Sequence, residues 1–243
     1  MASIPTSRKE SKFPKTIYDL IPDGDYDARI VRFIGLGVQE QPPYEGQEKE
    51  PAFKCSIVYE LIGTDVTGKT EDGEVVDPRP ACMFGDYFLF PGAERGNVFN
   101  LCKILDPSIK KVPSDIEWFT NKLNSVINVN VSKYKRKDGT FGNKINALSA
   151  IPTKYQSGIG DARTDLVGFD PYVDSPEMFG NYSKLYKFQH EILANAIDKD
   201  NIPFAGKEPA NLDGDSLKKP SSQASTNTST ESSVETPDDD APF

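Results

Sequence analysis

Cations and aromatic rings alternate in one short stretch of the chain, around the dipeptide Asp138-Gly139, which predicts the turn of a β-hairpin. The side chains concerned are Lys133, Tyr134, Lys135, Arg136, Lys137, Phe141 and Lys144. Cations neutralise phosphates and aromatic rings stack on unpaired bases, so the pattern favours binding of single-stranded nucleic acid. The alternative is a solvent-exposed hairpin tip, where lysines and a turn are ordinary.

Five residues on earlier β-type stretches are candidates for the same surface. They are Arg29, Arg32, Lys54, Tyr59 and Tyr87. Their inclusion depends on the strand register, because a shift of one residue turns each side chain to the opposite face of a sheet. We include them with the hairpin as predicted DNA-binding residues.

The elements that would position these residues follow one another as three strands, a helical interlude and a hairpin. Alternating residues predict strands at 26–34, 52–62 and 81–90 and the hairpin at 125–151. Between them, Ser114 and Glu117 have the spacing of a capping box at a helix start. This order predicts a mainly β fold, a five-stranded Greek-key OB-fold barrel with additional helices, followed by a disordered acidic tail. In an OB-fold, the loop between strands 4 and 5 rims the oligonucleotide groove.

Composition divides the chain into five parts. We predict a flexible basic arm at 1–20, an OB-fold domain at 21–155, an irregular segment with a docking helix at 156–205, a disordered linker at 206–237 and an acidic tip at 238–243. The docking helix is expected at 183–199, where apolar residues fall on one stripe. The linker is rich in Ser and Thr and cannot bury enough apolar surface to fold.

Charge and residue counts limit the function classes. The chain has 243 residues and a net charge of −9, but residues 1–160 balance 21 Lys+Arg against 21 Asp+Glu, so this part can still meet a polyanion. One histidine, and three cysteines without metal-ligand spacing, predict reduced thiols, no metal and no cofactor. No apolar run suits a membrane span and no secretory signal is recognised, which predicts a cytoplasmic protein.

The stretch from Gly63 to Thr70 matches the phosphate-binding pattern G-x-x-x-x-G-K-[ST]. A true P-loop opens a helix, whose N-terminal amides hold the phosphates. The residues that follow include Gly73, Pro78 and Pro80 together with four acids, which disfavour both a helix and a bound triphosphate. We interpret the match as a coincidence, and a nucleotide hydrolase is kept as an alternative hypothesis.

The end of the sequence combines like charges, a proline and a terminal ring, in Asp238, Asp239, Asp240, Pro242 and Phe243. Such a ring and carboxylates suit a basic-rimmed apolar pocket on a partner protein. The tip resembles that of bacterial and phage single-stranded-DNA-binding proteins, although Ala241 stands where bacterial members usually carry a larger apolar residue. The runs "PDGDYDARI" and "EKEPAFKCSIVYEL" and the hairpin before "ALSAIP" are similar to phage-encoded members.

The resemblance implies a protein that is not an enzyme and coats single-stranded DNA without strong sequence preference during replication, recombination or repair. It also implies that the acidic tip recruits replication or recombination proteins, in the host cytoplasm for a phage-encoded member. Only the hairpin cations and aromatics carry over as DNA contacts. An acidic adaptor that binds protein alone is a further alternative, and the sequence predicts no particular oligomeric state.

Overall fold

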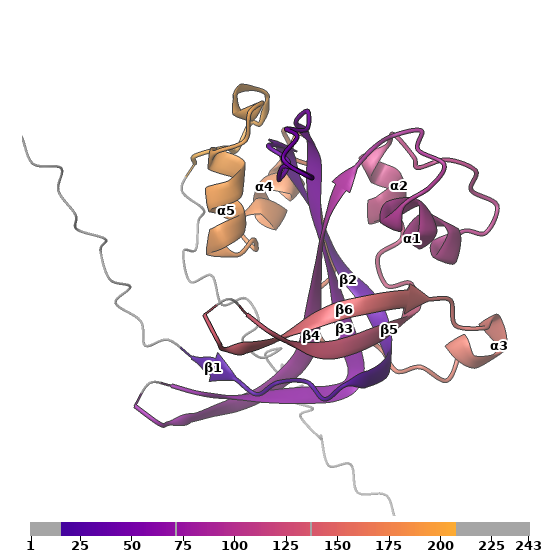
Figure 1. Ribbon diagram of the computed structural model, residues 1–243, viewed down its shortest axis with the longest axis vertical. Coiled ribbons are helices and arrows are strands. Elements are labelled where there is room, and N and C mark those ends of the chain that lie inside the picture. The colour runs from indigo at the N-terminus through magenta and orange to yellow at the C-terminus, as the bar shows by residue number, and fades with distance from the viewer. Residues whose placement is uncertain (1–15, 71, 137, 208–243) are drawn as a thin grey trace, which may run out of the picture.

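Long antiparallel strands dominate the computed structural model, which describes residues 16–70, 72–136 and 138–207 (Figure 1). The strands are β1 (Ile17–Tyr18), β2 (Gly24–Gln39), β3 (Ala52–Lys69), β4 (Val75–Leu89), β5 (Val126–Lys135), β6 (Phe141–Ser149) and β7 (Val167–Phe169). The helices are α1 (Asn97–Leu105), α2 (Ile116–Thr120), α3 (Thr153–Gln156), α4 (Pro176–Tyr182) and α5 (Lys187–Ala194), followed by a 3-10 turn at Lys199–Asn201.

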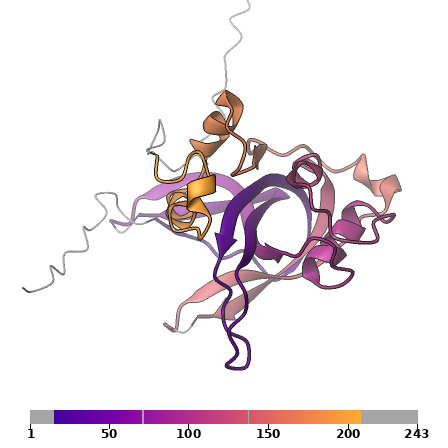
Figure 2. The ribbon, with the colours of Figure 1, turned by 90° about the horizontal axis from the view of Figure 1, so that it is seen from above.

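The strands form one sheet in the order β1-β3-β2-β5-β6, with β4 paired to β3 and β7 paired to β2. Within the described residues the pairings are antiparallel, apart from the parallel pairing of β7 with β2. Figure 2 shows how strongly the sheet curves. The mainly β class with few helices is therefore confirmed. The sheet is open, because no hydrogen-bonded pairing in the described part joins β4 to β6, so a closed five-stranded barrel is not shown.

The strand β2 changes neighbours along its length. Its first half pairs with β5, from Gly24 opposite Val131 to Arg29 opposite Val126. From Arg32 onward it pairs with β7 instead. Two segments that lie far apart in the sequence therefore share one edge of β2, and β7 brings the chain that follows β6 back onto the sheet.

The inner face of β2, β3 and β4 carries the main core. Ile30, Ile57 and Met83 point into it, together with Ile127 of β5, and each is almost completely buried. Buried residues of α1 and α2, such as Phe119, complete this core. Their burial is the main stabilising contribution, at roughly 25 cal/mol per Å² of apolar surface removed from water.

The outer face of the same strands carries Arg32, Val58 and Phe84. Residues 157–207, here called the C-terminal segment, pack against part of this face. A second apolar cluster forms where Ile34 meets residues of β7, α4 and α5. Because both faces of β2 are covered there, residues 31–37 of this strand are buried without alternation.

The C-terminal segment differs from its prediction in two ways. The stretch at 161–182, expected to be irregular, contains β7 and α4. The docking helix is shorter than the expected 183–199 and ends at Ala194, because the amide of Ile197 donates to the carbonyl of Val38 on β2 at 2.9 Å instead of continuing the helix. The helix does dock on the sheet, but as one of several pieces.

The phosphate-binding pattern does not form a loop before a helix. Gly63 to Lys69 continue β3, and Lys69 pairs with Val75 across a turn into β4. The N-terminal arm is partly a strand, since Ile17–Tyr18 form β1. Its residues 1–15, the linker from 208 on and the tip residues Asp238, Asp239, Asp240, Pro242 and Phe243 lie outside the described residues. In the described part, no helix has the length and apolar character needed to span a bilayer.

Candidate nucleic-acid interface

The register of β5 and β6 decides which hairpin side chains share a face. Lys135 lies opposite Phe141, and Lys133 lies two residues earlier on the same side of the ribbon. Both lysines are exposed, and Phe141 is 55% exposed although it is a large apolar ring. This hairpin face, formed by Lys133, Lys135 and Phe141, therefore offers two cations and one ring to a ligand.

The other predicted hairpin residues point to the opposite side. Tyr134 lies opposite Gly142, and Lys144 lies opposite Ser132, so both are on the reverse of the ribbon. They are also exposed. Strand alternation thus divides the continuous run of cations and rings into two faces, and a single strand of nucleic acid running along one side would meet only half of the run.

The turn of the hairpin is ordered by its own polar groups. The side chain and amide of Thr140 donate to the Asp138 carboxylate, which lowers the pKa of that carboxyl. The Arg136 guanidinium donates to the Thr140 hydroxyl at 3.3 Å and lies over Gly142, where an added Cβ would come within 2.7 Å of it. Arg136 therefore folds back across the ribbon. Lys137 lies outside the described residues.

Arg29 is used within the fold. Its guanidinium donates to the carbonyl oxygens of Asn124, Ile159 and Gly160 at 2.8 to 3.1 Å and lies 3.5 Å from the Asp161 carboxylate. Only 12% of its side chain is exposed. Its role is to attach the start of the C-terminal segment to β2, and the prediction that it contacts DNA is corrected.

Arg32 and Tyr59 are also removed from the predicted surface. Arg32 is 1% exposed, donates to the carbonyl of Lys184 at 2.9 Å and lies 4.9 Å from the centre of the Tyr186 ring. Tyr59 is on the inner face, fully buried, and its hydroxyl shares a 3.2 Å hydrogen bond with that of Tyr87. Burial raises the pKa of Tyr59 well above its ordinary value, so it stays neutral. Neither side chain reaches solvent.

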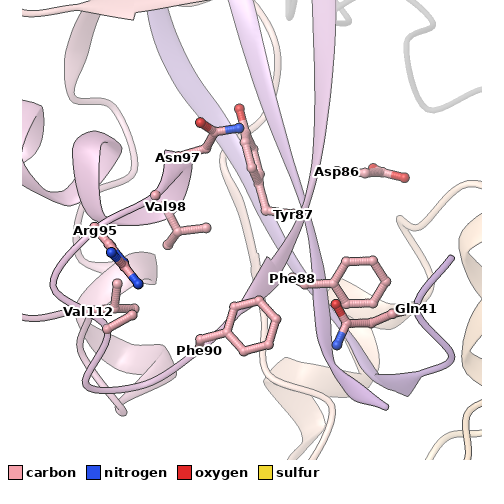
Figure 3. A pocket seen from close by; sticks show the side chains of 11 residues that line it. Gln41, Asp86, Tyr87, Phe88, Phe90, Arg95, Asn97, Val98 and Val112 are labelled. Atoms are coloured by element: carbon pink, nitrogen blue, oxygen red, sulfur yellow. The ribbon is translucent and has the colours of Figure 1, made fainter. Parts of the chain in front are cut away.

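The two remaining candidates are half-buried. Lys54 is on the outer face and forms a 3.0 Å ion pair with Asp86 across the β3–β4 ladder. Tyr87 lines a cavity of about 270 Å³ where β4 ends and α1 begins (Figure 3). The full lining comprises Gln41, Asp86, Tyr87, Phe88, Phe90, Ala93, Arg95, Gly96, Asn97, Val98 and Val112.

Sequence reasoning missed two residues of this cavity. Phe90 and Arg95 are both exposed and come from the end of β4 and the turn before α1. Both line the cavity, and in Figure 3 Asp86 lies on the opposite side of the view from Arg95. A guanidinium beside a ring can hold a phosphate and a base together. The signal was present as an aromatic residue five positions before an arginine in a glycine-rich turn, but the sequence alone does not bring the two side chains to one cavity.

Metal-ligating side chains do not gather in the part of the chain that the structure describes. No group of three or more His, Cys, Asp or Glu side chains in this described part could hold a metal ion. The three cysteines are free thiols, and burial raises the pKa of Cys82 and of Cys102 to about 11. The pKa of Cys55 is raised further for the same reason. These thiols are protonated near neutral pH and are poor nucleophiles.

Comparisons with protein-family models, with curated proteins and with solved structures found no match.

Proposed function

We propose that the protein binds single-stranded DNA without strong sequence preference, and that it does so during replication, recombination or repair. The observation that carries the proposal is the hairpin face, where Lys133 and Lys135 lie on the same side of the ribbon as the exposed ring of Phe141. Two cations and a ring on one surface suit a ligand that presents phosphates and unpaired bases together.

The strand order gives a second, independent support. In the sheet, β4 pairs with β3, β3 with β2, β2 with β5, and β5 with β6. These are the strand pairings of an OB barrel, except that the pairing that would close it, between its third strand (β4) and its fifth (β6), is missing among the described residues. We propose that the sheet is a partly open barrel of this kind. Its hairpin β5–β6 would then occupy the loop position that rims an OB groove. Recruitment of replication or recombination proteins by residues 238–243 stays a prediction, because the tip lies outside the described residues.

The proposal is tested by the salt dependence of binding to a fluorescent oligo(dT). Replacing Lys133 and Lys135 together with alanine should reduce the magnitude of the salt slope by about 1.4, since each phosphate contact to a single strand contributes about 0.7. The matched control removes Lys154 and Lys199, which are exposed but lie on α3 and the 3-10 turn. The control should keep the wild-type slope. Absence of oligo(dT) binding by the wild-type protein, as an adaptor that binds protein alone would show, contradicts the proposal.

A further inference from the structure

The C-terminal segment covers part of the outer face of β3 and β4, and buried polar contacts hold it there. The Glu60 carboxylate is 1% exposed and accepts from the amides of Arg163 and Thr164 at 2.8 and 2.7 Å. Nearby, Arg32 donates to the carbonyl of Lys184. Such bonds to ionised groups are among the stronger hydrogen bonds in proteins, so this part of the segment is held in a defined position.

Three rings meet where the cover ends. Phe84 of β4 lies edge-on to Tyr186 and to Phe188, with ring centres 5.6 and 6.4 Å apart. Tyr186 and Phe188 are stacked, with centres 5.7 Å apart and planes 7° from parallel. We call these three residues the ring cluster.

The ring cluster is exposed in an unusual way. Phe84 is 41% and Phe188 44% exposed, although both touch the buried ring of Tyr186 and would gain from further burial. Beneath them, Tyr186 is held by the Arg32 guanidinium against its face and by a 3.1 Å bond from its amide to the Gln189 side chain. Tyr186 is therefore buried and held in place, whereas the rings of Phe84 and Phe188 that contact it are partly exposed.

Two exposed cations adjoin the ring cluster in the sequence, and one exposed acid, Glu191, follows Phe188 by three residues. Lys187 lies between the two stacked rings in sequence, and Lys184 precedes them, both with exposed side chains. Asp86, two residues beyond Phe84 and on the same face, is paired with Lys54 at 3.0 Å. Apolar rings beside cations suit an unpaired base and its phosphate better than they suit a neutral apolar partner.

The position of Phe84 points the same way. It lies opposite Val58 in the β3–β4 ladder and faces outward. In the proposed OB-type barrel these are the second and third strands, whose outer surface is the one that takes oligonucleotides. The C-terminal segment covers part of that surface and, in Tyr186 and Phe188, places new rings at its edge.

We propose that the ring cluster of Phe84, Tyr186 and Phe188 is a stacking platform for an unpaired nucleobase, with Lys184 and Lys187 beside the adjoining phosphates. This inference rests on the proposed function and adds a second contact region to it, built from the C-terminal segment rather than from the hairpin.

The test compares an oligo(dT) with an abasic oligonucleotide of the same length, because the two differ in bases and share phosphates. Phe84→Leu and Phe188→Leu each remove a ring while keeping an apolar side chain. Each should lower the preference for oligo(dT) over the abasic strand by at least about fivefold, with binding to the abasic strand unchanged. The control is Phe179→Leu, the same change on a partly exposed ring of α4 within the same segment, and it should keep the wild-type preference.

The possible outcomes separate this inference from the proposed function. A wild-type protein that binds neither oligonucleotide overturns both. Equal binding to both strands by the wild type overturns the stacking platform and leaves DNA binding through phosphates intact. A preference for oligo(dT) that survives both leucine variants also overturns the platform, because the bases then stack elsewhere.

Discussion

The hairpin face and the ring cluster offer the same kinds of groups but are built in different ways. Lys133, Lys135 and Phe141 come from nine consecutive residues and are positioned mainly by the β5–β6 ladder, with the Lys133 amide also donating to the Asp23 carboxylate at 2.8 Å. Phe84 and Phe188 are more than a hundred residues apart in the sequence and meet because the C-terminal segment is fixed on the sheet. The hairpin face therefore depends mostly on local pairing, whereas the ring cluster depends on the packing of the C-terminal segment against the sheet.

This difference divides the expected binding energy. Exposed lysines on a hairpin contribute mainly through phosphate neutralisation, which weakens as salt rises. The rings of the ring cluster contribute through stacking, which requires nucleobases in the ligand. The hairpin should therefore control the salt dependence of DNA binding, and the ring cluster should control the difference between strands with and without bases.

The largest change in the free energy of unfolding is expected from removing Arg32, which holds Tyr186 in the ring cluster. Arg32→Ala removes a buried guanidinium that contacts Tyr186 and the carbonyl of Lys184. A hydrogen bond to a charged donor contributes about 1.5 to 3 kcal/mol and a desolvated cation–π contact about 2 kcal/mol, so losing both should lower the free energy of unfolding by about 3 kcal/mol or more. Urea denaturation measures this, and Lys199→Ala, at an exposed site of the same segment, should change it little. An Arg32→Ala protein as stable as the wild type would show that Arg32 does not hold the segment.

A smaller loss is expected at the contact between β2 and the C-terminal segment. A Cβ added at Gly35 would lie 2.5 Å from the Pro171 ring and 3.2 Å from the Phe169 carbonyl oxygen. Gly35→Ala should lower the free energy of unfolding by about 1 to 3 kcal/mol through overpacking. It should also increase proteolysis of the segment.

The matched control is Gly180→Ala, because a Cβ there meets nothing within 4 Å and the residue is in α4. That change should raise the free energy of unfolding by up to about 1 kcal/mol, since alanine favours a helix over glycine. Equal effects of the two alanines would contradict the tight contact at Gly35.

The two regions should separate in a salt titration. Lys133→Ala combined with Lys135→Ala should flatten the salt slope and keep the preference for oligo(dT) over an abasic strand. Phe188→Leu should do the reverse, keeping the slope and losing preference. If both variants change both properties equally, the hairpin and the ring cluster act as one site and the division between them is wrong.

The smallest effect is expected from pH. Burial lowers the pKa of His190, whose ring edge contacts Tyr182 with centres 4.4 Å apart. A lowered pKa in the folded state favours the neutral ring, so its contribution to stability is full above the ordinary value of 6.5 and is lost as the pH falls below it. His190→Gln should make the unfolding free energy less dependent on pH between about 7 and 5. An unchanged pH dependence in this variant would show that His190 does not contribute to it.

Much of the sheet could be predicted because its signals are local. Alternation located the strands now seen as β2, β3, β4, β5 and β6, and Asp138-Gly139 located the hairpin turn. The facing of the arginines was harder, because a bulge between Ile30 and Arg32 shifts the register of β2. Arg32 does point to the outer face, and it is buried because the C-terminal segment covers that face.

The ring cluster could not be predicted, because it depends on contacts between distant parts of the chain. Phe84 fits any strand and Phe188 fits any amphipathic helix, so neither has a local signal for a site. The same is true of Tyr59, whose inward facing follows from its place opposite Met83 in the core ladder. The cations of the hairpin face could be located in the sequence, whereas the arrangement of the rings in the ring cluster depends on the tertiary structure.

Binding of single-stranded DNA by the wild-type protein can be measured in a single titration. A fluorescent oligo(dT) is titrated with wild-type protein at low salt and then challenged with unlabelled oligo(dT) or with duplex DNA of equal length. We expect saturable binding that unlabelled oligo(dT) displaces more effectively than the duplex, since the paired and stacked bases of a duplex cannot reach the ring cluster. No saturable binding, or equal displacement by the duplex, would contradict the proposal that the protein binds single-stranded DNA.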